Sequence, residues 1–186
     1  MGRAADRTGE APDDASSLAV RARTATHELV ADAGRVGPLV HRRGVVGRPI
    51  PVRIPGSSAT PNGRVATPGS WFVPVTVGER LAGFALVDVV TGPPAGDPDE
   101  RDPAARIRRW STFQRHEGDL ESCPPAPLWT DPGTIAATAV AAVGAPEGAV
   151  TGEPVLTWER TPEHLVWEVT VAGRSVHVAG SSAWPA

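Results

Sequence analysis

Alternating apolar and polar positions near the C-terminus predict the clearest strands of the chain. The apolar members of this alternation are Leu165, Trp167, Val169 and Val171. A tight turn at residues 172–173 places Val169 opposite Val176. The same register places Glu168 opposite His177, so that apolar side chains share one face and polar side chains the other. The pattern therefore predicts a half-buried antiparallel hairpin.

A helix is predicted just before this hairpin. Asp131 is a good N-cap residue, Pro132 fits the first helical position, and Gly144 can end the helix after a run of apolar residues at helical spacing. A β-prone segment at residues 155–159 follows. The C-terminal part is thus expected to be one helix followed by three strands.

A similar order of elements occurs earlier in the chain. Apolar residues at helical spacing predict a helix over about 17–33, and alternating residues predict a hairpin over 70–91. Between them, residues 36–54 read as an arginine-rich approach into an extended segment, which the prolines at 49, 51 and 55 confine to a sheet edge or a loop. Residues 106–114 have the character of a further strand of the first sheet.

The two hairpins share local sequence. Residues 75–77 (Val-Thr-Val) match residues 169–171, and Arg80 matches Arg174 at the same offset. An internal duplication and a chance similarity between two alternating hairpins both account for this match.

These elements predict an α+β fold with two helix-plus-antiparallel-strand units (αβββ twice) and helices packed on one face of the sheet or sheets. Residues 1–14 are expected to form a disordered tail and 15–116 the first unit. Residues 117–127 read as a proline-rich linker and 128–186 as the second unit. We expect the two units to pack as one compact body.

Charge and composition argue against nucleic acid and membranes as partners. The formal net charge is −3, but residues 21–64 carry eight arginines against two acidic residues. A basic stretch can contact phosphates, yet this one has neither clustered aromatic residues nor a nucleic-acid-binding motif, so we expect a solvated surface and no nucleic acid partner. Residues 1–17 lack the apolar core of a signal peptide, and no run is long enough to span a membrane. We therefore expect a cytoplasmic protein without a membrane partner.

Reactive side chains are few. Cys123 is the single cysteine, so an intramolecular disulfide is excluded, and nearby acidic residues would oppose its pairing with His116 as a nucleophile. Residues 116–119 offer one imidazole and two carboxylates, but no second His or Cys stands at a metal-ligand spacing. We expect no metal site, no cofactor and no catalytic constellation.

Six tryptophans are the one unusual feature of the composition. The segment Arg108, Arg109 and Trp110 combines the residue types that are favoured at protein interfaces, so we expect it to bind an acidic or peptide partner. Trp71, Phe84 and Trp167 fall on predicted inward faces and are candidates to line a pocket. Trp129 and Trp184 lie near segment ends, where they could line a groove or an interface.

The helix-then-strands order, with residues 84–92 (Phe-Ala-Leu-Val-Asp-Val-Val-Thr-Gly) closing the first unit, resembles the PepSY family. Domains of that family are small α+β units whose last strand often ends in an Asp-x-x-Thr-Gly-like turn. The second unit departs from this pattern and ends with residues 179–182 (Ala-Gly-Ser-Ser). The resemblance implies a module, usually outside the cytoplasm, that binds or restrains partner proteins, peptidases included.

Two functions remain open at this point. The first is a non-catalytic binding or regulatory module for a protein or peptide. The alternative is a small-molecule pocket, with or without catalysis in a biosynthetic pathway, that works by shape and a few polar groups. A pocket lined by Trp71, Phe84 and Trp167 would favour the alternative, whereas a filled core with an exposed Trp-Arg patch would favour the first.

Overall fold

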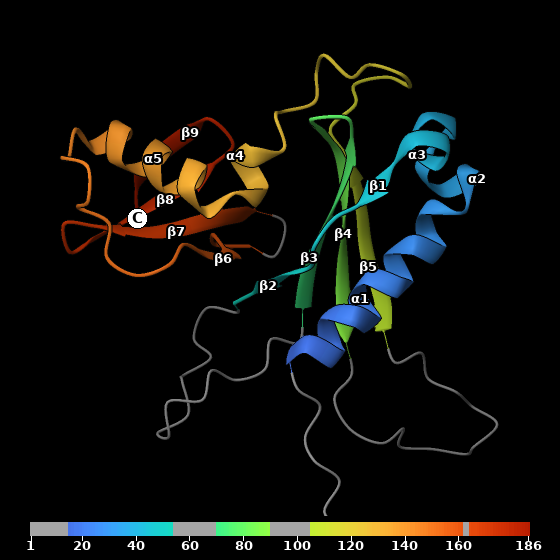
Figure 1. Cartoon of the computed structure of the whole chain (residues 1–186), viewed down its shortest axis with the longest axis horizontal. Helices are drawn as coiled ribbons and strands as arrows, with labels where there is room; N and C mark the ends of the chain where they lie inside the picture. Colours follow the sequence, from blue (N-terminus) through green and yellow to red (C-terminus); the bar gives the residue numbers. More distant parts are fainter. Residues whose placement is uncertain (1–14, 54–69, 90–104, 162–163) are drawn as a thin grey trace, which may run out of the picture.

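The computed structural model describes residues 15–53, 70–89, 105–161 and 164–186 (Figure 1). It has an α+β fold with two antiparallel sheets, as the sequence predicts. The first half contains helices α1 (Ala15–Val30), α2 (Ala33–Val36) and α3 (Pro38–Arg43), and strands β1 (Val45–Val46), β2 (Ile50–Val52), β3 (Ser70–Val77), β4 (Arg80–Val89) and β5 (Ala105–Thr112). The second half contains helices α4 (Pro127–Thr130) and α5 (Pro132–Val143), and strands β6 (Val155–Trp158), β7 (Leu165–Val171), β8 (Arg174–Ala179) and β9 (Ser182–Pro185). The predicted tail at 1–14 and the Thr91-Gly92 part of the PepSY-like turn lie outside the described ranges.

Strand β3 is the centre of the first sheet, because β1 and β2 pair with one of its edges and β4 with the other. Strand β5 pairs with β4, so the further strand that the sequence indicates is present. Helix α1 lies along one side of this sheet (Figure 1). Its buried residues Leu18, Ala22 and Leu29 form one hydrophobic cluster with alternate residues of β3, among them Val73 and Val75. The spacing of apolar residues in α1 thus buries one stripe of the helix against the sheet.

The segment between α1 and the first sheet differs from the expectation. The expected extended segment is present at the sheet edge as β2, but the sequence did not predict that the approach to it contains helix α3 at residues 38–43. Pro38 takes the first position of α3, where its missing N–H group costs nothing and its fixed φ favours a helix. Only the short edge strands β1 and β2 are extended, with Pro51 opposite Trp71.

The second sheet is a simple meander in the order β6-β7-β8-β9. Its central hairpin has the predicted register, with Glu168 opposite His177 and Val169 opposite Val176. The sequence did not predict β9. Strand β9 has only four residues, and its apolar side chains Ala183 and Trp184 are adjacent, so no alternation of apolar and polar residues is visible.

Helix α5 forms as its sequence signals indicate. The Asp131 carboxylate accepts a hydrogen bond from the Thr134 backbone N–H at 2.8 Å, and Gly144 ends the helix in the left-handed conformation. The fully buried residues Ile135 and Ala139 pack in one hydrophobic cluster with residues of β7 and β8. This cluster also contains Phe72 of the first sheet, so it joins the two halves of the chain.

Hydrogen bonds to the backbone of Arg53 and of the predicted linker reinforce this junction. The Arg53 N–H donates to the Leu156 carbonyl at 2.8 Å, and the Thr157 hydroxyl donates to the Arg53 carbonyl at 2.9 Å. The predicted linker is attached to the first sheet as well, because the Leu81 N–H donates to the Pro124 carbonyl at 2.9 Å. None of the helices in the described ranges combines the length and the apolar character that crossing a membrane requires.

Candidate functional site

The three residues predicted to line a pocket are not brought together. Trp71 packs in the cluster under α1, and Trp167 packs in the cluster that joins the two halves. Each is 3% exposed, and neither indole nitrogen has a hydrogen-bond partner among the described residues. Of the three, Phe84 lines the cleft described below, whereas Trp71 and Trp167 are not part of its lining. Trp71 and Trp167 therefore fill the interior.

The predicted partner-binding segment lies on β5 and does not form one surface. The pairing of β4 with β5 shifts register next to Arg109, which leaves Arg108 without a partner on β4. The Arg108 guanidinium lies over the Trp158 ring of β6, 5.5 Å from its centroid. Trp110 instead packs on the cluster under α1, against Gly83. Partner binding by these residues stays a prediction, and the structure gives it two separate faces.

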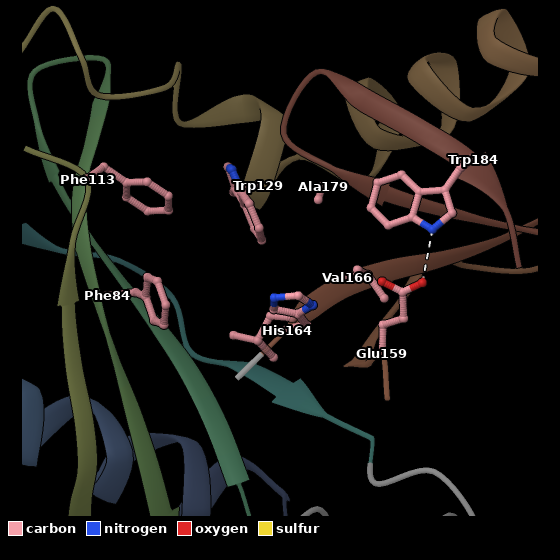
Figure 2. Close-up of a pocket in the computed structure, with 9 residues that line it drawn as sticks. Phe84, Phe113, Trp129, Glu159, His164, Val166, Ala179 and Trp184 are labelled. Atoms are coloured by element: carbon pink, nitrogen blue, oxygen red, sulfur yellow. Dashed lines mark hydrogen bonds between the residues drawn. The ribbon is translucent and has the colours of Figure 1, made fainter. Parts of the chain in front are cut away.

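A cleft lies where the two halves meet, between β4, the end of β5, helix α4 and the second sheet (Figure 2). Its volume is about 430 Å³. Its lining is mostly aromatic and aliphatic, with one carboxylate and one imidazole. The lining residues are Phe84, Phe113, Trp129, Glu159, His164, Leu165, Val166, Ala179 and Trp184.

One wall of the cleft is a continuous group of aromatic rings. The Phe84 and Phe113 centroids are 5.8 Å apart, and those of Phe113 and Trp129 are 5.9 Å apart, both with tilted ring planes. Phe72 lies behind this wall, with its ring 4.8 Å from that of Phe84. Because Phe72 is fully buried, it holds the wall in place from the core.

The opposite wall contains the one carboxylate of the lining. The indole nitrogen of Trp184 donates a hydrogen bond to Oε1 of Glu159 at 3.1 Å (Figure 2). His177 Nδ1 is 3.5 Å from the same oxygen, which is too long for a good hydrogen bond. The hydrogen bond from Trp184 is the main cause of a lowered pKa at Glu159; partial burial opposes this shift, and His177 and Arg160 add to it. The carboxylate is therefore ionised at neutral pH.

The turn between β6 and β7 positions the two polar groups. The Glu159 N–H donates to the His164 carbonyl at 2.8 Å, which closes the turn just after β6. Arg160 has a φ of 59°, a conformation that few non-glycine residues adopt. His164 is exposed, whereas the Glu159 side chain is 20% exposed.

The other chemical candidates are not part of the cleft lining. Cys123 is 1% exposed, and burial is the main cause of its raised pKa, to which Asp119 adds. His116 Nδ1 is 3.8 Å from an Asp119 carboxylate oxygen, and His116 is mostly exposed. Within the described ranges, no group of three or more His, Cys, Asp or Glu side chains is placed to hold a metal ion.

Sequence reasoning found part of this site. Phe84 was predicted to line a pocket, and Trp129 and Trp184 were expected to line a groove or an interface, but Phe113, Glu159 and His164 were missed. Phe113 directly follows β5 and Glu159 directly follows β6, so neither position carries a signal in the local pattern. A comparison of the chain with protein-family models, with curated proteins and with solved structures found no match.

Proposed function

We propose that the protein is a non-catalytic binding module that holds its ligand in the aromatic cleft. The observation that carries this proposal is the cavity of about 430 Å³ with four aromatic side chains and one ionised carboxylate in its lining. Pockets of this size that are mostly apolar, with a few placed polar groups, are typical of ligand-binding sites. The apolar lining supplies affinity, and Glu159 supplies orientation.

The state of the carboxylate favours recognition over acid catalysis. A general acid holds a proton near the working pH, and enzymes raise the pKa of a carboxyl group for that purpose. The pKa of Glu159 is instead lowered, and its Oε1 already accepts the Trp184 hydrogen bond. Such a group is suited to orient a positively charged or hydrogen-bond-donating ligand.

The ligand is either a small molecule or a side chain of a protein or peptide. The resemblance to PepSY domains stays a prediction, and it is compatible with a protein or peptide ligand. The single buried cysteine is compatible with the proposed cytoplasmic location.

Nuclear magnetic resonance of the indole N–H groups tests this proposal. Each of the six tryptophans has one indole N–H group. Trp129 and Trp184 line the cleft, whereas Trp71 and Trp167 are buried outside it. In a screen of small apolar and aromatic fragments, we expect hits to shift the Trp129 and Trp184 signals and to leave those of Trp71 and Trp167 in place. If no fragment shifts the cleft signals selectively, the cleft is not a binding site.

Catalysis is the second candidate, because His177, which is not part of the lining, lies 3.5 Å from the Glu159 carboxylate, which is part of it. A carboxylate beside an imidazole can orient it as a general base. A ligand that is recovered unchanged after long incubation with the protein supports binding. Conversion of the ligand that is lost in His177→Gln would assign an enzyme.

A further inference from the structure

We infer that the cleft binds a methylated ammonium group, carried either by a free small molecule or by a side chain of a peptide. This inference rests on the proposed function and names the chemical class of the ligand. Three properties of the lining lead to it: its aromatic rings, its single negative charge and its small number of hydrogen-bond acceptors.

The aromatic rings provide the first argument. Phe84, Phe113 and Trp129 form one wall, with neighbouring centroids 5.8 and 5.9 Å apart. The benzo ring of Trp184 extends toward the cleft from the other side (Figure 2). A cation within about 6 Å of such ring centroids is attracted by the negative faces of the rings. Several rings around one cavity add these attractions without requiring hydrogen bonds.

The charge of Glu159 provides the second argument. Its Oε1 accepts from Trp184, while the second oxygen turns away from the indole toward the side of Val166 (Figure 2). Among the described residues, no hydrogen bond to this second oxygen is found. A partly buried carboxylate with a free oxygen attracts a cation more strongly than a carboxylate in bulk water does. The positive charge of Arg160 also interacts with Glu159 and offsets part of its negative charge, so the attraction for a ligand cation is moderate.

The hydrogen-bonding capacity of the lining provides the third argument. A primary ammonium has three N–H donors and a guanidinium has five, and a buried donor without a partner is costly. Glu159 is the one carboxylate in the lining, beside the His164 imidazole and seven hydrocarbon or aromatic side chains. A methylated ammonium retains its charge but presents methyl groups to the rings. It therefore matches this lining better than a primary ammonium, a guanidinium or an anion.

A matched pair of probes tests the inference. Choline and 3,3-dimethylbutan-1-ol have nearly the same shape, but only choline is charged. We titrate each into the whole chain and follow the Trp129 and Trp184 indole signals. We expect choline to bind roughly tenfold more tightly than its neutral isostere. A pentapeptide with a central trimethyllysine, compared with its all-carbon isostere, distinguishes the two sources: tighter binding of the peptide than of choline assigns a peptide side chain.

Two substitutions and one control separate the contribution of the Glu159 charge to binding from that of the aromatic rings. Glu159→Gln keeps the side-chain shape and should weaken choline binding about fivefold while leaving the neutral isostere unaffected. Glu153→Gln makes the same charge change at an exposed residue outside the lining and should alter neither affinity. Phe84→Leu keeps an apolar side chain but removes a ring, and should weaken choline more than the isostere.

The outcomes distinguish the inference from the proposed function. Equal binding of choline and its isostere overturns the ammonium inference and leaves the cleft as an apolar binding site. A preference for choline that Glu159→Gln leaves undiminished also overturns it. If neither probe binds but other fragments shift the cleft signals, the inference fails and the proposed function stands. If nothing shifts the cleft signals, both fail.

Discussion

The hydrogen bond from the Trp184 indole to Glu159 connects the two ends of the second sheet. Glu159 directly follows β6, and Trp184 belongs to β9, while β7 and β8 lie between these edge strands. The side chains therefore reach across the face of two strands, and His177 of β8 lies beneath them, with its ring 6.2 Å from that of Trp184. The same contact that holds the two edges fixes the carboxylate in the wall of the cleft.

The first prediction concerns the charge of Glu159. Trp184→Phe keeps an aromatic ring but removes the N–H donor, so the pKa of Glu159 should rise toward its ordinary value. In the wild-type protein, the lowered pKa means that the unfolded chain binds more protons, so this contribution to stability is present at neutral pH and is lost as the pH falls through the folded-state pKa. In the variant, the decrease in the free energy of unfolding between neutral and acidic pH should therefore be smaller.

Carbon-13 titration of the carboxyl signals, with urea unfolding at neutral and acidic pH, measures both effects. Asp131 serves as an internal control, because a hydrogen bond from Thr134 at the start of α5 is the main cause of its own lowered pKa. The Asp131 titration should be the same in both proteins. An unchanged pKa of Glu159 in Trp184→Phe would show that the indole does not hold the carboxylate in solution.

The sequence predicted the fold well wherever local patterns agree with the tertiary contacts. Alternation fixed the register at Glu168 and His177, and capping chemistry fixed both ends of α5. It missed α3, because the approach to the proline-containing segment was read only as arginine-rich, and the signal of Pro38 at the start of a helix was not used. It also failed at β9, which is too short for a periodic signal.

The candidate site was harder to predict, because it forms where the two halves meet. Phe84 and Trp184 lie far apart in the chain, and nothing in local periodicity indicates that they line one cavity. Trp167 does face inward, as its place in the alternation predicts. An inward side chain fills the core unless a neighbouring element leaves space beside it, and Trp167 therefore lies in the core and not in a pocket. Such space depends on how the sheets pack, which a pattern in one segment does not encode.

The second prediction concerns Cys123. Because the side chain is 1% exposed and burial raises its pKa, the thiol should be protonated at neutral pH and shielded from reagents. We expect Ellman's reagent to modify it at least about a hundredfold more slowly in the folded protein than in denaturing urea, because reaction requires local opening. Rapid modification of the folded protein would show that the segment after β5 opens readily.

The third prediction compares two Gly-to-Ala substitutions. An added Cβ at Gly83 would lie 2.6 Å from the Ser111 carbonyl oxygen and 2.6 Å from Cη2 of Trp110. Since backbone and a packed indole must move, Gly83→Ala should lower the free energy of unfolding by about 1–3 kcal/mol. At Gly133, in the first turn of α5, the nearest atom would be an Asp131 carboxylate oxygen at 3.5 Å.

Gly133→Ala is therefore the matched control and should be neutral or slightly stabilising, because alanine favours the helix and restricts the unfolded chain. Urea unfolding of the two variants provides the measurement. Equal stability of the two variants would mean that β5 does not pack on β4 as closely as the contact at Gly83 requires.

The last prediction concerns the coupling of the two halves. Ile135 of α5 is fully buried in the cluster that also contains Phe72 and Leu86 of the first sheet. Ile135→Ala removes three carbon atoms from this shared core and should lower the free energy of unfolding by about 2–5 kcal/mol. Because the cluster spans both sheets, the loss should reach both halves. Hydrogen exchange should show reduced protection at the amides of Phe72 and Leu86 as well as at those of β7.

Ala19 of α1 provides the matched comparison, because it packs only on the other cluster, under α1. Ala19→Gly should reduce the free energy of unfolding by about 1 kcal/mol through the helix itself. Two separately unfolding halves would respond differently to the two variants: Ile135→Ala would lower protection in the second half alone, and Ala19→Gly in the first half alone. A single cooperative unit lowers global protection in both cases, and the cleft between the halves then exists only while the whole chain is folded.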